Sequence, residues 1–154
     1  MSDPYTEVRA RLLPQLELEE GVRLRPYQDT VGKWTIGIGR NLTDVGISMD
    51  EAIVLCDTDM SNAITELEHY LWYAKLDTVR QTALASMMFN MGSNRFAGFH
   101  NMLAAFEAGN YDAAAGEAAN SAWYKQVGHR GLRIVTMIRT GEWPDDVQYA
   151  EGAV

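Results

Sequence analysis

Apolar residues recur at helical spacing through most of the chain beyond Ser48. The segment Ser48-Met49-Asp50-Glu51 has the form of a capping box, in which serine and glutamate satisfy each other's free backbone donors. The helix behind it is expected to run toward Tyr70, with an apolar face made of Ile53, Met60, Ile64, Leu67 and Leu71. Further helices are expected from an Asp77 cap to Gly92, from Phe96 to Ala108, from Tyr111 to Ala119 and from His129 to Thr140.

Another helical pattern precedes Ser48. Apolar residues from Pro4 to Leu18 follow a helical period, but Pro14 removes a backbone donor in its middle. We therefore expect either a kink at Pro14 or two short helices. Gly21 should end the helix directly after Glu20.

The segment from Arg23 to Ile38 predicts an antiparallel hairpin. Its residues are aromatic and β-branched, and Asp29 to Gly32 supply turn chemistry. A third short strand can follow near Arg40 to Thr43. Together these elements predict an α+β fold that is mostly helical, with a small antiparallel sheet.

The 154 residues are enough for a single domain, 1–154, which we divide into two lobes. The smaller lobe would hold the N-terminal helix and the hairpin and extend to about residue 47. A linking helix over 48–72, a helical lobe over 73–143 and a flexible tail over 144–154 would follow. The N-terminal helix is expected to pack on the helical lobe.

Composition narrows the class of protein. The chain is 47% hydrophobic and 22% charged, which is typical of a globular protein. Its net charge of -8 argues against unspecific nucleic-acid binding, which needs clustered Lys and Arg. Cys56, the only cysteine, rules out an intrachain disulfide, and its apolar neighbours predict a buried thiol. The three histidines show no ligand spacing, so we expect no metal and no cofactor.

The start of the chain, Met1 to Tyr5, carries neither a basic segment nor an apolar run. We therefore expect no signal peptide and no stable membrane insertion, with synthesis in the cytoplasm of a host cell. A monomer is expected.

Two acids and a hydroxyl fall on three consecutive short elements: Glu20 at a helix end, Asp29 at a turn and Thr35 on the returning strand. Cleavage of an acetal needs one protonated carboxyl to hand a proton to the leaving oxygen. It also needs an ionised carboxylate to support the cation-like centre or activate water. Taken alone, Asp29 is equally an Asx-type turn former, and Thr35 a good strand residue.

The stretch from Glu19 to Leu42 resembles the signature of the phage-type lysozymes, glycoside hydrolase family 24, whose pattern is Glu, eight residues, Asp, five residues, Thr. Later motifs follow in the order and rough spacing of that family, namely Phe89-Asn90-Met91-Gly92, Ala97-Gly98-Phe99, Trp123-Tyr124 and Arg139-Thr140-Gly141-Glu142-Trp143. The resemblance covers most of Leu12 to Trp143.

The resemblance implies a role for each catalytic candidate. Glu20 would be the general acid, which requires an apolar, partly buried setting that its flanking Leu18 and Val22 allow. Asp29 would stabilise the oxocarbenium-like centre and help to position water, and Thr35 would orient that water. Members of the family are described as inverting.

The family also implies a lysozyme (EC 3.2.1.17) that cleaves the β-1,4 bond between N-acetylmuramic acid and N-acetylglucosamine in peptidoglycan. A phage endolysin for host lysis, acting in the periplasm, fits best. Because no signal peptide is expected, a holin pore or delivery inside a virion would bring the enzyme to the wall.

Substrate contacts follow the same resemblance. Asn41, Met102 and Glu117 fall where relatives contact sugar with Leu, Ser and Asn, so these positions depart from the family pattern. Phe89 matches an aromatic residue of the cleft, although a plain core role is nearly as good. Arg130 matches a basic residue near the catalytic glutamate and can equally be a solvated helix arginine.

One structural ion pair is implied as well. Arg40 and Asp59 correspond to a pair of opposite charge that helps to hold the lobes together in a similar lysozyme, and we predict that they meet.

Two other functions remain open. A lytic transglycosylase would use Glu20 alone and close the sugar on itself, which the presence of Asp29 and Thr35 disfavours. A non-catalytic wall-binding or virion module would keep the fold without the activity, which the complete catalytic pattern disfavours.

Overall fold

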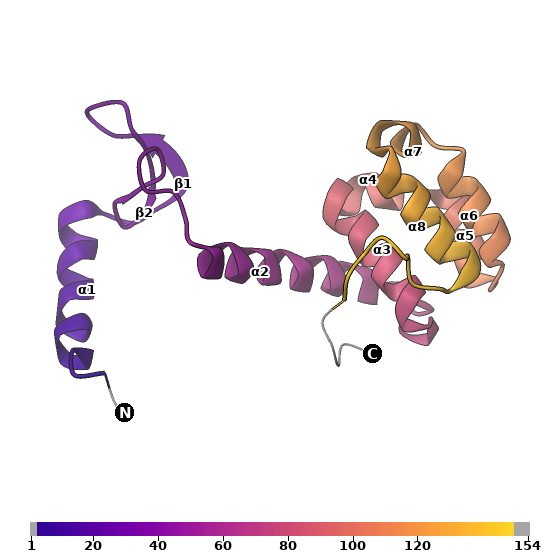
Figure 1. Ribbon diagram of the computed structural model, residues 1–154, viewed down its shortest axis with the longest axis horizontal. Coiled ribbons are helices and arrows are strands. Elements are labelled where there is room, and N and C mark those ends of the chain that lie inside the picture. Colours follow the sequence, from indigo (N-terminus) through magenta and orange to yellow (C-terminus); the bar gives the residue numbers. More distant parts are fainter. Residues whose placement is uncertain (1–2, 150–154) are drawn as a thin grey trace. The chain divides into compact units, whose positions relative to one another are not determined.

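The computed structural model describes residues 3–149 (Figure 1). These residues are mostly helical, with a small antiparallel sheet in the order β1-β2-β3, which confirms the predicted α+β class. The chain divides into two compact units, unit 1 up to Val54 and unit 2 from Leu55 onward. Within the described residues, no helix combines the length and the apolar content that a membrane span needs.

Unit 1 begins with helix α1 (Thr6–Glu20), which continues through Pro14 as one element. The alternative of two short helices is therefore wrong. Pro14 removes a single backbone hydrogen bond, and the bonds on either side keep the helix together. Gly21 ends the helix as predicted, with φ at 74° and its N–H donating to the Glu17 carbonyl at 3.1 Å.

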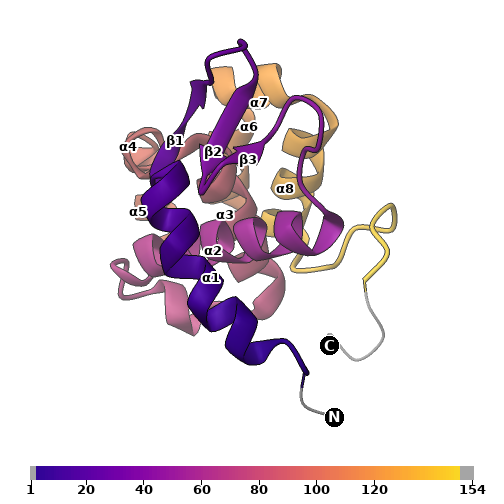
Figure 2. The same ribbon diagram turned by 90° about the vertical axis from the view of Figure 1, so that its left-hand side faces the viewer.

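The sheet of unit 1 contains β1 (Arg23–Gln28), β2 (Trp34–Gly37) and β3 (Arg40–Asn41). Both strand pairs are antiparallel, and Figure 2 shows the strands side by side. β2 is the central strand: Thr35 lies opposite Tyr27 on one side and Asn41 on the other. The predicted hairpin and third strand are confirmed.

Helix α2 (Met49–Glu68) begins at the predicted capping box. The Ser48 N–H donates to Glu51 Oε2 at 2.8 Å, and the Glu51 N–H donates to Ser48 Oγ at 3.2 Å. The buried residues of α2 are Ala63 and Leu67, so the predicted apolar face reaches the core only in its last turns. Cys56, two turns before Ala63 on the same face, is exposed, and the predicted buried thiol is wrong.

Unit 2 is helical throughout. After the short 3₁₀ turn Tyr73–Lys75 it contains α3 (Thr78–Met91), α4 (Ser93–Ala97), α5 (His100–Glu107), α6 (Tyr111–Ala119), α7 (Ala122–Val127) and α8 (His129–Thr140). The cap at Asp77 is confirmed, since its carboxylate accepts the Arg80 N–H at 3.0 Å. The single helix predicted over 96–108 is wrong, because the chain breaks at Gly98 and Phe99 into α4 and α5. Helix α7 was not predicted.

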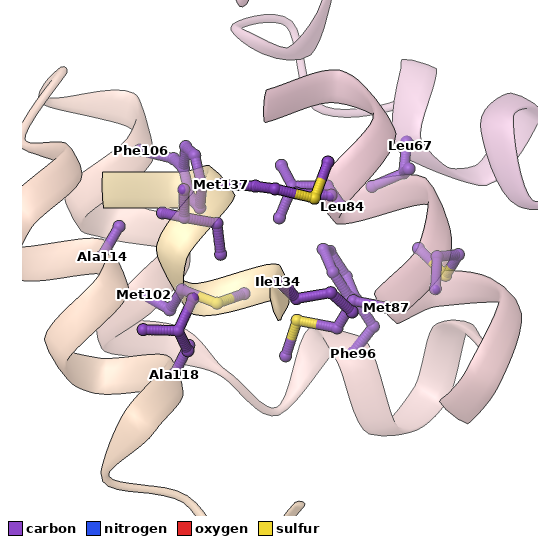
Figure 3. Close-up of a cluster of buried hydrophobic side chains, with 14 of the residues drawn as sticks. Leu67, Leu84, Met87, Phe96, Met102, Phe106, Ala114, Ala118, Ile134 and Met137 are labelled. Carbon is purple, nitrogen blue, oxygen red and sulfur yellow. The ribbon is translucent and has the colours of Figure 1, made fainter. Parts of the chain in front are cut away.

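Unit 2 also contains the hydrophobic core (Figure 3). Its largest fully buried side chains are Leu67, Leu84, Met87, Phe96, Met102, Phe106 and Ile138. In unit 1, by contrast, Thr35 is the one buried residue among those described. The stability that apolar burial provides is therefore concentrated in unit 2.

The C-terminal segment follows α8 as far as Tyr149. Arg133 of α8 donates to both oxygens of Asp146, at 3.0 and 2.6 Å, and the Tyr149 ring lies 4.7 Å from that of Trp143. The described part of the predicted flexible tail thus contacts unit 2. Residues 150–154 lie outside the described residues.

Candidate active site

Glu20, the predicted proton donor, is the last residue of α1. Its side chain is exposed, and so are its neighbours Leu18 (87%) and Val22 (54%). Within unit 1, Leu18 and Val22 therefore provide no apolar setting for Glu20. The nearest wall is the backbone of Gly39, in the turn between β2 and β3: a Cβ built there would lie 3.0 Å from Glu20 Oε2.

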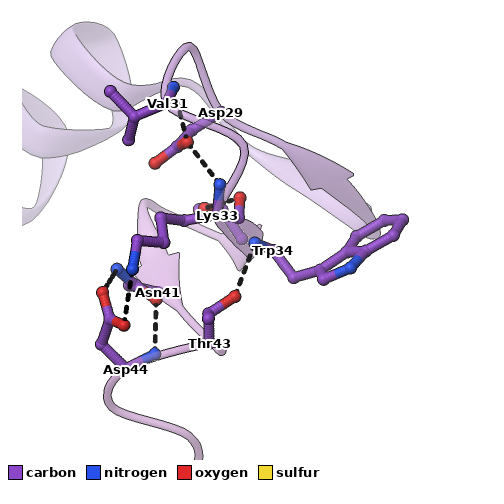
Figure 4. A network of polar contacts seen from close by, with 8 residues as sticks. Asp29, Val31, Lys33, Trp34, Asn41, Thr43 and Asp44 are labelled. Carbon is purple, nitrogen blue, oxygen red and sulfur yellow. Dashed lines mark hydrogen bonds and ion pairs between the residues drawn. The ribbon is translucent and has the colours of Figure 1, made fainter.

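Asp29 lies just after β1, and its carboxylate is fixed by backbone donors (Figure 4). Asp29 Oδ1 accepts the Val31 N–H at 3.0 Å and the Lys33 N–H at 2.8 Å. The backbone N–H of Asp29 in turn donates to the Lys33 carbonyl at 2.9 Å. Asp29 is thus the turn former that the sequence suggested. Oδ2 accepts no hydrogen bond in residues 3–149.

Lys33 places a positive charge next to Asp29, which the sequence analysis missed. Its ammonium donates to Asp44 Oδ1 at 2.8 Å. This bond raises the pKa of Lys33, and the negative charge of Asp29 adds to the effect. The same bond, together with one from Asn41, lowers the pKa of Asp44. A basic residue four positions after the turn acid was the available signal.

Thr35 is 5% exposed, which makes it the one buried polar residue in the described part of the chain. Its hydroxyl donates to the Lys33 carbonyl at 3.2 Å, so its lone pairs are left to accept hydrogen bonds. Thr35 is the second residue of β2, and the turn that begins at Asp29 leads directly into this strand.

The three catalytic candidates are thus all carried by unit 1, around β2. Asp29 belongs to the turn that enters this strand, and Glu20 lies against Gly39 in the turn that leaves it. β2 has four residues, and a strand rises about 3.3 Å per residue, so the two turns lie roughly 10 Å apart.

The side chain of Asn41, one of the predicted sugar contacts, forms hydrogen bonds with the nearby Asp44. Its amide Nδ2 donates to Asp44 Oδ2 at 3.0 Å, and its Oδ1 accepts the Asp44 N–H at 2.9 Å. The side chain therefore holds the loop after β3.

Phe89 and Arg130 line the same hollow of unit 2, which has a volume of about 670 Å³. Phe89, on α3, is 46% exposed, so the plain core role is excluded. The rest of the lining is largely apolar and comes mainly from α2 and α3, including Met60, Ile64, Tyr73 and Ala85. Arg130 makes no hydrogen bond or ion pair within residues 3–149.

Met102 and Glu117 line a second, more polar hollow of unit 2, of about 500 Å³. Met102 is only 1% exposed and belongs mainly to the core, whereas Glu117 is exposed and accepts a long bond of 3.4 Å from Asn101 Nδ2. Trp123 lines the same hollow, and its indole N–H donates to Asn90 Oδ1 at 2.9 Å. Asn90 was not predicted as a contact, although its motif was recognised.

Within unit 1 the Arg40 guanidinium forms two bonds with Glu51, at 2.9 and 2.6 Å, a partner that was not predicted. The predicted pair of Arg40 with Asp59, a residue of unit 2, stays a prediction. Glu51 is already turned toward this region by the capping box, which brings its carboxylate within reach.

The described residues contain no group of three His, Cys, Asp or Glu side chains that could hold a metal ion.

Comparison with known proteins gives a consistent result. A family model described as Phage lysozyme matches residues 17–139. Probable T4-type lysozyme 2 of Dictyostelium discoideum is 31% identical, over 84% of this chain and 94% of its own length. Pre-baseplate central spike protein Gp5 of Enterobacteria phage T4 is 31% identical over 82% of this chain, but only 27% of its own length. The endolysin of Salmonella phage P22 is 30% identical, over 71% of this chain and 79% of its own length.

The family match spans most of the chain and includes the segment with Glu20, Asp29 and Thr35. It confirms the resemblance inferred from the sequence. The chain belongs to the phage lysozyme family.

Proposed function

We propose that this chain is a lysozyme that hydrolyses the β-1,4 bond between N-acetylmuramic acid and N-acetylglucosamine in peptidoglycan. The observation that carries the proposal is the arrangement around β2. Asp29 is held by two backbone N–H groups at one end of the strand, and Glu20 lies at the other end. Family membership supports the reaction class.

In the proposed mechanism Glu20 donates its proton to the glycosidic oxygen as the bond to the anomeric carbon breaks. Asp29 remains ionised and stabilises the positive charge that develops on the sugar ring. Its Oδ2 accepts a proton from the attacking water, while Oδ1 stays bonded to the backbone. The Thr35 hydroxyl accepts a hydrogen bond from the second hydrogen of that water. This bond directs a lone pair of the water oxygen toward the anomeric carbon.

We further propose that the reaction inverts the anomeric configuration. Inverting enzymes hold their carboxyl groups about 6.5–9.5 Å apart to admit a water, whereas retaining enzymes need about 5–5.5 Å. Asp29 and Glu20 lie near opposite ends of β2, a strand roughly 10 Å long, and this placement favours the wider spacing. NMR of the first product should therefore show the α-anomer, and a β-configured product would contradict inversion.

Sugar recognition is proposed to involve unit 2. The exposed ring of Phe89 shares one hollow with the Arg130 guanidinium, for which residues 3–149 provide no partner, and Glu117 with the edge of Met102 shares another. The Phe89 ring is suited to pack against the face of a sugar ring. The Arg130 guanidinium is suited to bind the carboxylate of a muramic acid residue. Asn41 remains a predicted contact, and pairing of Arg130 with Glu20 also stays a prediction.

A virion-associated lysozyme module is a second candidate for the biological role. It is supported by the match to the T4 spike protein, in which the similar segment is a minor part of a longer chain. A free endolysin is supported by the match to the P22 endolysin, and its passage to the periplasm through a holin stays a prediction. Both roles use the same hydrolysis.

The decisive experiment is clearing of purified peptidoglycan by wild type, Glu20→Gln and Glu19→Gln. A general acid contributes about 10²–10⁴-fold, so Glu20→Gln should lose activity by that factor. Glu19 precedes it on the same helix, and its carboxylate accepts a bond from Gln15 at 2.8 Å, so Glu19→Gln should clear like wild type.

Equal clearing by wild type and Glu20→Gln would overturn the assignment, and absence of clearing by wild type would favour a non-catalytic wall-binding or virion module. Mass spectrometry of the products separates hydrolysis from a lytic transglycosylase. Reducing ends are expected, and 1,6-anhydro ends would indicate the transglycosylase.

A further inference from the structure

The backbone of Gly39 lies directly against the side chain of Glu20. A Cβ at position 39 would stand 3.0 Å from Glu20 Oε2 and 3.2 Å from both its Cδ and its Cγ. Real Cβ atoms rarely have such close neighbours. A side chain at position 39 would therefore require the Glu20 side chain to shift by a few tenths of an ångström.

Within the described part of unit 1, no polar contact of Glu20 competes with this packing. Within residues 3–149 the Glu20 carboxylate accepts no hydrogen bond and pairs with no cation. Asp29, in contrast, is held by two backbone donors, and Glu19 by the amide of Gln15. The end of α1 fixes the backbone of Glu20, and the surface of Gly39 limits the rotamers its side chain can adopt.

We propose that Gly39 is a positioning residue for the proton donor, an inference that rests on the proposed function of Glu20. Because Gly39 has no side chain, its Cα can pack against the carboxyl group and the Cγ atom of Glu20. This contact positions Glu20 without hydrogen bonds that would occupy its carboxyl oxygens. Proton transfer requires the carboxyl to lie within hydrogen-bond reach of the leaving oxygen. A methyl group at position 39 pushes it away from that point.

Gly39 has a second reason to be glycine, and the experiment must separate the two. Its φ is +71°, and with Ile38 before it the turn has the φ signs of type II, which favours glycine at this position. Gly37, in the same hairpin, has a nearly equal φ of +69° but open space around its Cβ position. Gly37→Ala therefore introduces the same kind of backbone strain without the contact to Glu20.

The activity test compares Gly39→Ala with Gly37→Ala on peptidoglycan. A Cβ at position 39 displaces the Glu20 side chain by a few tenths of an ångström, and a misplacement of about 1 Å costs roughly 100-fold, so Gly39→Ala should lose about tenfold in kcat. Its KM should stay within about twofold of wild type, because the displaced group acts only in the transition state. Gly37→Ala should keep kcat within about threefold. Equal kcat losses in the two variants would overturn the proposal.

A stability test follows the contact independently of activity. Gly39→Ala should melt at a lower temperature than Gly37→Ala in the wild-type background, because only the former displaces Glu20. In a Glu20→Ala background the side chain is gone, so the difference between the two glycine variants should vanish. If Gly39→Ala alone does not fold, the Glu20→Ala double variant should fold.

Persistence of the difference without the Glu20 side chain would show that the turn is the cause, which contradicts the proposal. A wild type without activity on peptidoglycan would instead refute the proposed function, with the melting comparison still reporting the contact. The two failures are thereby distinguishable.

Discussion

At the residue scale, the two carboxylates of the candidate site are held in different ways. Asp29 is fixed by the N–H groups of Val31 and Lys33, whereas Glu20 is placed by contact with Gly39. These modes suit the proposed roles. An anion that stays charged benefits from donors directed at one of its oxygens, whereas a proton donor needs its carboxyl free to face the substrate.

Asp29 should serve activity and stability through separate parts of its carboxylate. Asp29→Asn keeps an oxygen that accepts the Val31 and Lys33 N–H groups, so it should lose hydrolysis while unfolding at nearly the wild-type free energy. Asp29→Ala should lose hydrolysis as well and, in addition, about 1–2 kcal/mol of stability, because both donors lose their acceptor. Chemical denaturation with a clearing assay measures both effects.

Equal stability of Asp29→Asn and Asp29→Ala would show that the turn does not depend on these bonds. Retained clearing by Asp29→Asn would remove the carboxylate from the mechanism.

At the element scale, the start of α2 joins a helix cap to an ion pair. Glu51 accepts the Ser48 N–H and binds Arg40 after the β2–β3 turn, so one side chain links the helix to the sheet. The backbone N–H of Ser48 is the largest cause of the lowered pKa of Glu51, and the Arg40 guanidinium adds to it.

This lowered pKa gives a prediction for acid stability. A carboxyl whose pKa is lower in the folded state stabilises the protein above its unfolded pKa, near 4.5, and loses that contribution as the pH falls through its folded pKa. Glu51→Gln should therefore melt below wild type at neutral pH, and the gap should close as the pH drops well below 4.5. Thermal melts across this range measure it.

Asp50→Asn is the matched control for Glu51→Gln, because Asp50 is the neighbouring carboxylate and makes no hydrogen bond in the described part of the chain. Its melting temperature should track wild type at each pH. A gap for Glu51→Gln that does not depend on pH would contradict the linkage.

Elements defined by nearby residues could be predicted from the sequence. The capping box at Ser48, the cap at Asp77 and the Gly21 end of α1 each form within a few residues, and all were confirmed. The turn chemistry from Asp29 to Gly32 likewise located the hairpin. Local hydrogen-bonding rules are enough for such features.

Features that depend on distant residues could not be predicted. The exposure of Cys56 depends on where the core of unit 2 ends along α2, and Arg40 could have paired with any acid on that helix. Arg80 of α3 donates to the carbonyls of Ile138 and Arg139 in α8, at 2.7 and 3.1 Å. These residues lie far from Arg80 in the sequence, so no local pattern indicates the bonds. The contact between Gly39 and the Glu20 side chain also joins residues that are distant in the sequence, and no local pattern indicates it.

At the scale of the whole molecule, the two units differ in how they are stabilised. Unit 2 contains the apolar core, whereas Thr35 is the one buried residue described in unit 1. Hydrogen bonds and the contacts of short strands therefore carry a larger share of the stability of unit 1. Segments with few buried apolar contacts open at a lower free energy than the core.

Native-state hydrogen exchange should detect this difference. Amides of α3 and α8 are expected to exchange only on global unfolding, and amides of β1 and β2 through smaller openings. Leu84→Ala, which should cost about 2–5 kcal/mol in the core, should lower the protection of α3 and α8 and leave the sheet amides nearly unchanged. Equal protection of sheet and core amides in wild type would contradict the expectation.

The placement of Glu20, Asp29 and Thr35 on a single unit has an evolutionary consequence. If bond cleavage is encoded in unit 1 and sugar selection largely in unit 2, mutations that retarget the enzyme to a different wall can accumulate without retuning the reaction.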